Sequence, residues 1–102
     1  TQADMNRCAQ QELDKYEKDL KALTDKLEKR YATSPEKLKN FKEARKSWER
    51  YVKNQIDLLY SESEGSVSGM CSTLDVARLT QQRLEQLQEW DQRKEGYVCD
   101  GL

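Results

Sequence analysis

The sequence predicts an all-α protein, a three-helix antiparallel bundle with up-down-up topology that is stapled by a disulfide. Three observations support this fold class. The chain has one proline and 36% charged residues. Its apolar residues, among them two Trp and five Tyr, recur every three or four positions, which is typical of helices and argues against disorder. Two short segments, 32–36 and 61–69, divide this pattern into three helical stretches and disfavour one extended coiled coil.

The first helix is expected over residues 2–32. Thr1 followed by Asp4 is typical of a capping box, in which the hydroxyl accepts a backbone hydrogen bond and the carboxylate lies at the positive end of the helix dipole. Residues spaced by three or four define its core face, with Cys8 at the edge. These residues are Met5, Ala9, Leu13, Tyr16, Leu20, Leu23 and Leu27.

The second helix is expected over residues 35–60. Ser34 and Pro35 form a typical pair of N-cap and first helical residue, and Glu36 adds a carboxylate to the first turn. The turn before it is short, so the first two helices should be antiparallel neighbours. The predicted inward residues are Leu38, Phe41, Ala44 or Arg45, Trp48, Val52, Gln55 and Leu59.

The third helix is expected over residues 70–95, after a loop rich in glycine and serine. Gln81 interrupts its apolar pattern, and Gly96 is a plausible C-terminal residue that leaves a short tail, 96–102. Residues 1–95 then form a single helical-bundle domain. The predicted inward residues are Met70, Leu74, Ala77, Leu84 and Leu87, with Leu79 and Trp90 at the margins.

The three cysteines lack the spacing of a metal site and indicate an oxidising compartment. In an up-down-up bundle Cys8 and Cys71 lie at the same end, whereas a third helix of roughly 36 Å separates Cys99 from them, at about 1.5 Å per residue. We therefore expect a Cys8–Cys71 disulfide. Cys99 would be free or would form an intermolecular bond in a homodimer.

The composition argues against an enzyme and against a metal or cofactor site. The chain has no histidine, no glycine-rich phosphate loop and no Cys-x-x-Cys pair. It also has no apolar run long enough for a transmembrane helix. The sequence thus predicts no catalytic residues, no metal ligands, no cofactor and no transmembrane segment. A start at Thr1 would fit a signal peptide that has been removed.

Positive charge is concentrated in the middle of the chain. Residues 26–53 contain ten basic and four acidic residues. The basic face of the second helix, from Arg45 to Lys53, could therefore attract an anionic polymer. Acidic residues are interspersed throughout, however, so a solvated helix face is the preferred interpretation and nucleic-acid binding is not expected.

Three segments of the sequence resemble a known family. The opening TQADMNRCA contains Met5, Asn6 and Cys8; the second helix contains Trp48 and Tyr51; and the third contains LTQQR. This order resembles the secreted bacterial domain named after the LprI lysozyme inhibitor, which has a TQ-x-x-MN-x-C-A opening, an A-x-x-x-W-x-x-[FY] helix and an LT-x-x-R-x-x-x-L helix. The matching residues of the last motif are Leu79, Thr80, Arg83 and Leu87.

The resemblance implies an exported helical bundle of the bacterial envelope, periplasmic or extracellular, with lysozyme inhibition among its members. Two departures affect its cysteines. The family often has a cysteine after the aromatic residue of the second helix, where this chain has Val52 to Ile56, and another at the position of Asp75, one turn after Cys71. The usual disulfide set of the family therefore does not transfer to this chain.

The sequence and the resemblance together predict an exported interaction domain that binds a protein and inhibits lysozyme by occlusion. Glu62 and Glu64, in the loop after the second helix, are candidate contacts because acidic residues would attract a basic lysozyme. Two alternatives remain open. One is a structural or adaptor module of the envelope, and the other is an anionic-polymer binder.

Overall fold

The computed structural model describes residues 1–62 and 66–93, which form three long helices. They are α1, Gln2–Tyr31; α2, Pro35–Tyr60; and α3, Ser66–Gln92. The described residues contain no strand, so the predicted all-α class is confirmed. The third helix begins four residues before the expected residue 70 and its described part ends at Gln92 rather than at residue 95.

The two helix starts have the local chemistry that the sequence indicates. In α1, the Thr1 hydroxyl accepts a hydrogen bond from the Asp4 backbone amide at 3.2 Å, and the Asp4 carboxylate accepts one from the Thr1 backbone nitrogen at 3.4 Å, which completes a capping box. In α2, the Ser34 hydroxyl accepts a hydrogen bond from the Lys37 amide at 3.4 Å, and Pro35 occupies the first turn. These caps satisfy amide groups that a helix leaves without an internal partner.

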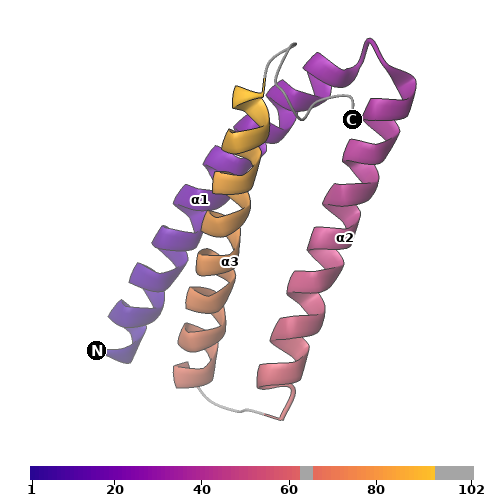
Figure 1. The fold of residues 1–102 in the computed structure, drawn as a ribbon. Helices are drawn as coiled ribbons and strands as arrows, with labels where there is room; N and C mark the ends of the chain where they lie inside the picture. The colour runs from indigo at the N-terminus through magenta and orange to yellow at the C-terminus, as the bar shows by residue number, and fades with distance from the viewer. Residues whose placement is uncertain (63–65, 94–102) are drawn as a thin grey trace.

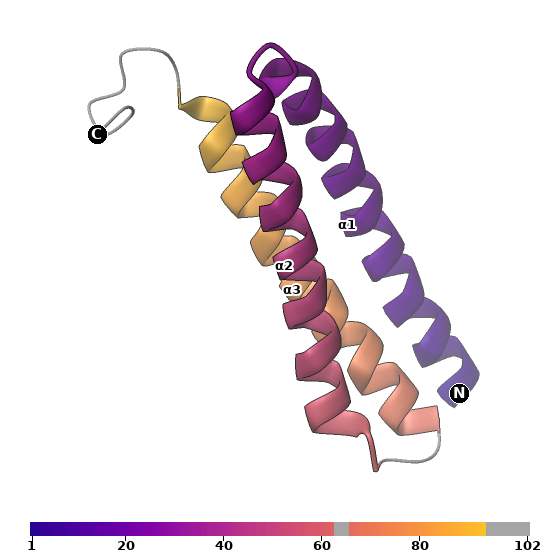
Figure 2. The ribbon, with the colours of Figure 1, turned by 90° about the vertical axis from the view of Figure 1, so that its right-hand side faces the viewer.

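α1 and α3 lie side by side along most of their length, whereas α2 packs only loosely against either of them (Figures 1 and 2). At one end, Gln2 donates a hydrogen bond to the Met70 sulfur at 3.7 Å. At the other end, the Asp91 carboxylate bonds Lys26 at 3.0 Å and also Arg30. α1 and α3 therefore run in the same direction. α2 runs in the opposite direction, from the end of α1 to the start of α3.

Asp91 joins the last turns of the two parallel helices. Its hydrogen bond to Lys26 lowers the pKa of its carboxyl, and the bond to Arg30 and the charges of both cations act in the same direction against desolvation. Arg30 also donates a hydrogen bond to the Asp91 carbonyl at 3.0 Å. The pair of cations on α1 thus fixes the C-terminal part of α3.

The three helices meet in one apolar cluster near the turn between α1 and α2. Leu27, Phe41 and Leu87 are its buried members, one from each helix. The Phe41 ring lies 5.3 Å from the Tyr31 ring and 6.4 Å from the Trp90 ring, measured between centroids. Phe41 is the buried residue of α2, so this end of the molecule is where α2 is anchored.

The buried face of α3 differs from the expected one. Ala77, Leu79, Thr80, Arg83 and Leu87 are buried, whereas Leu74 is exposed and Leu84 is only half-buried. Residues 76, 80, 83, 87 and 90 follow the same spacing of four and three as an apolar heptad, but two of these positions carry a threonine and an arginine. The predicted inward positions Ala77 and Leu87 are therefore confirmed, whereas Leu74 and Leu84 were chosen because apolar spacing alone passes over Thr80 and Arg83.

Candidate functional site

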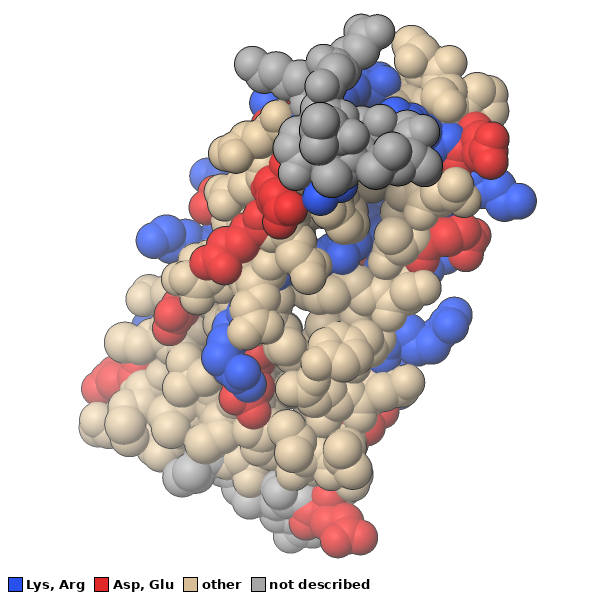
Figure 3. All heavy atoms as spheres, viewed as in Figure 1, with Lys and Arg blue, Asp and Glu red and all other residues tan. Residues whose placement is uncertain are grey.

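A cleft of about 450 Å³ lies where α2 separates from the other two helices, and all three helices line it. Leu20 and Thr24 of α1 and Trp48 and Val52 of α2 form its walls, and α3 forms its floor. On the face shown in Figure 3, the surface between α3 and α2 is hollowed, and the residues beside the hollow are mostly uncharged. The cleft exists because α2 packs less closely against α1 and α3 than these two helices pack against each other.

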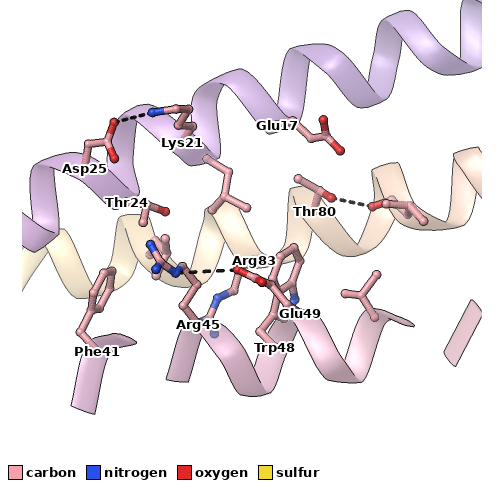
Figure 4. Close-up of a pocket in the computed structure, with 14 residues that line it drawn as sticks. Glu17, Lys21, Thr24, Asp25, Phe41, Arg45, Trp48, Glu49, Thr80 and Arg83 are labelled. Carbon is pink, nitrogen blue, oxygen red and sulfur yellow. Dashed lines mark hydrogen bonds and ion pairs between the residues drawn. The ribbon is translucent and has the colours of Figure 1, made fainter. Parts of the chain in front are cut away.

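Four of the family-motif residues line this cleft: Trp48, Thr80, Arg83 and the buried Leu87. Trp48 extends from α2, and Thr80 and Arg83 extend from α3, as Figure 4 shows. The Thr80 hydroxyl donates a hydrogen bond to the Val76 carbonyl at 2.7 Å, so its polar group is satisfied within its own helix. Leu79 is buried elsewhere, and Tyr51 is exposed on α2, so neither of these two residues lines the cleft.

Arg83 is the unusual residue of the cleft. It is only 9% exposed, yet it lines the cleft floor. Its guanidinium carbon lies 4.9 Å from the centre of the Trp90 ring and 5.8 Å from that of Trp48, which are distances typical of cation–π contacts. Desolvation lowers the pKa of this guanidinium, although an arginine remains charged at neutral pH.

The charged groups at the rim of the cleft are largely paired with one another. Lys21 bonds Asp25 at 3.0 Å along α1. Arg45 of α2 bonds Glu28 of α1 at 2.7 Å and also lies 3.7 Å from Glu49. Arg83, in contrast, donates its described hydrogen bond to the neutral side-chain oxygen of Gln86, at 3.2 Å. Among the described residues, no carboxylate forms an ion pair with Arg83.

The motif residues of the opening lie at the opposite end of the molecule and have structural surroundings. Asn6 accepts a hydrogen bond from Gln2 at 2.9 Å. Met5 and Cys8 line a shallow hollow of about 330 Å³ together with Met70 of α3. The opening motif therefore shapes the contact between the first turns of α1 and α3.

The expected Cys8–Cys71 disulfide is not present, and both cysteines are free thiols. The two helices do bring their first turns together, but the residues of α3 that face Cys8 across the hollow are Met70 and Leu74. Cys71 follows Met70 in α3 but does not line this hollow. Both cysteines lie near the first turns of α1 and α3, at the expected end of the bundle, but the topology does not fix their directions around each helix axis.

The remaining site predictions concern the loop and the tail. Glu62 is exposed at the end of α2. Glu64 and Cys99 lie outside the described residues, as does the predicted tail from residue 96 onward. Within residues 1–62 and 66–93, no three His, Cys, Asp or Glu side chains are grouped so that they could hold a metal ion.

An exposed apolar surface lies at the end of the molecule opposite the Phe41 cluster. Leu58 and Leu59 of α2, Leu74 of α3 and Met5 of α1 are all exposed there, and Leu58 is 79% exposed. In Figure 3 the lower part of the molecule, around the end of α2 and the start of α3, is mostly free of charged side chains. We call these four residues the apolar end. Sequence periodicity placed Leu59, Leu74 and Met5 on core faces, and loose packing of α2 leaves them in contact with solvent.

None of the three described helices has the length and hydrophobicity that crossing a lipid bilayer requires. Comparison with curated proteins and comparison with solved structures found no match. The family model described as "Lysozyme inhibitor LprI" matches residues 1–87, a range that includes the motif residues of the opening, of α2 and of the cleft floor. The chain therefore belongs to the LprI lysozyme inhibitor family.

Proposed function

We propose that this chain is an exported protein-binding domain that inhibits lysozyme by covering its substrate-binding cleft, without chemistry of its own. The observation that carries the proposal is the family match over residues 1–87. The name of the family supplies the class of partner, a lysozyme. Export follows from the same proposal, because a lysozyme acts on the cell wall, outside the cytoplasm.

The apolar end is the surface that supports this proposal. Its residues come from three helices and lie at one end of a molecule about 52 Å long. Exposed apolar residues gathered in one place commonly mark a protein-binding surface. The exposed carboxylate of Glu62 lies beside Leu58 and Leu59 in the chain and would attract a basic partner.

The anionic-polymer alternative receives less support from the arrangement of charges. Basic side chains on α2 pair with carboxylates: Arg45 with Glu28 at 2.7 Å, and Lys53 with Asp57 at 2.6 Å. A cation that is already paired with a carboxylate has less to gain from a phosphate or another anion. The paired cations therefore favour a protein partner over a polyanion.

The decisive test is a lysozyme activity assay with the purified chain at micromolar concentration. The unchanged chain should slow lysis, and Leu58→Asp and Glu62→Lys should each weaken inhibition at least tenfold. Glu43→Lys is the control for the charge reversal, because Glu43 is an exposed carboxylate of α2 that lies away from the apolar end. Undiminished lysis with several types of lysozyme would refute the function. Equal inhibition by all variants would refute the proposed surface.

A further inference from the structure

We propose that the cleft between α2 and the other two helices binds an amphipathic carboxylate, a single carboxylate group on an aliphatic chain, with Arg83 as the residue that binds the carboxylate. This inference goes beyond lysozyme inhibition and does not depend on it. It rests on four features of the cleft: a buried cation, its aromatic neighbours, the apolar walls and the paired rim.

The buried cation is the first feature. Arg83 is more than nine-tenths buried and lines the floor of the cleft. Burial of a charge is costly unless an opposite charge or several hydrogen bonds compensate for it. Among the described residues, Arg83 donates one hydrogen bond, to the neutral side-chain oxygen of Gln86, and no carboxylate pairs with it. An anionic ligand would supply the missing charge.

The aromatic neighbours determine which parts of the guanidinium remain available. Trp90 and Trp48 lie within 6 Å of its central carbon, at 4.9 and 5.8 Å. In contacts of this kind the face of an aromatic ring is turned to the guanidinium. Its N–H groups point outward within the plane, and their fork matches the two oxygens of a carboxylate. The described hydrogen bond to Gln86 uses Nη1, so the guanidinium has further N–H donors for an incoming carboxylate.

The walls and the rim indicate what the rest of the ligand is. Leu20, Phe41, Val52, Val76 and Leu87 line the cleft and are apolar. Its volume of about 450 Å³ falls in the range of small-molecule sites. A cleft of this kind favours an aliphatic chain over a polar body.

The rim would add little repulsion against an anion. Asp25 is paired with Lys21, and Glu49 lies near Arg45. Glu17 is an exposed carboxylate that lines the cleft toward the end opposite Phe41 (Figure 4). Solvent screens an exposed charge more than a buried one, so Arg83 should dominate at the floor.

The test uses the two tryptophans as built-in reporters, because the chain has no others and both lie against Arg83. Decanoate, kept below its micellar concentration, should change the tryptophan fluorescence of the full chain and saturate at one equivalent. Decanol has the same chain without the charge and should bind at least tenfold more weakly. Arg83→Met should weaken decanoate binding at least tenfold, whereas Arg78→Met, an exposed arginine on the same helix, should leave it unchanged.

A second variant tests the cleft without removing the buried cation. Val52→Phe adds volume to the wall and retains Arg83, so it should also weaken decanoate binding if the aliphatic chain occupies the cleft. This variant decides the question if circular dichroism shows that Arg83→Met does not fold. Equal binding of decanol and decanoate, a fluorescence change that does not saturate, or wild-type affinity in the folded variants would each overturn the proposal.

Discussion

At the scale of single residues, the most informative side chain is Arg83. Arg83 belongs to the series of α3 positions 76, 80, 83, 87 and 90, which have the spacing of a heptad repeat, and it is buried although its side chain is charged. Two tryptophan rings lie within 6 Å of the guanidinium carbon, and the residue is buried in the floor of the cleft. Burial of an arginine between helices lowers folding stability more than burial of a leucine would, because the charge loses its hydration. A buried arginine in such a position is therefore a functional candidate.

Tyr60 provides a second test at this scale. Its hydroxyl donates a hydrogen bond to the Asp75 carboxylate at 2.5 Å, and this bond, together with desolvation and the carboxylate charge, raises its pKa from 10.0 to about 12. A raised pKa means that the protonated phenol stabilises the folded state. This stabilisation is complete below pH 10 and is lost as the pH rises through about 12.

We therefore expect Tyr60→Phe to remove one phenol that ionises near pH 12 and to remove the corresponding fall in stability between pH 10 and 12. The measurement is an absorbance titration of the phenolates, combined with urea unfolding at each pH. Tyr51→Phe is the control because Tyr51 is exposed on the same helix. A Tyr60→Phe titration that still contains the step near pH 12 would contradict the assignment.

At the scale of helices, packing is unequal. α1 and α3 are joined at both ends, by Gln2 with Met70 and by Lys26 and Arg30 with Asp91. α2 contributes Phe41 to the cluster of Leu27 and Leu87, and polar contacts join Arg45 to α1 and Tyr60 to α3. The unfolding free energy should therefore depend strongly on the few buried residues of this cluster.

Leu27→Ala tests this dependence. Leu27 has no exposed surface, so its truncation leaves a cavity between three helices and should cost about 2–5 kcal/mol of unfolding free energy. Leu58→Ala is the matched control: it makes the same chemical change at a residue that is 79% exposed, so its effect should be within about 0.5 kcal/mol. Urea unfolding followed by circular dichroism measures both values. Similar losses for the two variants would contradict the assignment of the core.

At the scale of the whole molecule, the protein is an elongated bundle with principal dimensions of 52, 23 and 22 Å. One end contains the aromatic cluster and the other has the exposed apolar end, with the cleft between them. The two proposed activities thus use different places, and each can be removed by mutation without touching the other.

Loose packing of α2 has a consequence for local stability. Amides of α2 beyond Trp48 should exchange with solvent faster than those of α1 and α3 at the same level of the bundle, because fewer buried side chains hold this part of α2. Hydrogen exchange followed by mass spectrometry measures this difference. Decanoate should slow the exchange of these α2 amides if it bridges α2 and α3 in the cleft. Equal protection of all three helices without ligand would contradict the loose packing.

The sequence by itself determined the three helices, the caps at Thr1 and Ser34, and the family. These properties are local. A cap depends on residues three positions apart, and helical periodicity is recognised from apolar residues that recur every three or four positions within one segment. The sequence also marked Trp48, Thr80 and Arg83 as family-motif residues. It did not indicate that they meet, because they belong to different helices.

The tertiary structure alone decided how far α2 stands from its neighbours and how each helix is rotated about its axis. The rotation of α3 about its axis sets Met70 and Leu74, and not Cys71, opposite Cys8, and the two cysteines are free thiols. The same rotation of α3 about its axis places Arg83 on the cleft floor and leaves Leu74 exposed. Apolar spacing defines a face about 100° wide, and only packing against other helices selects the rotation within it.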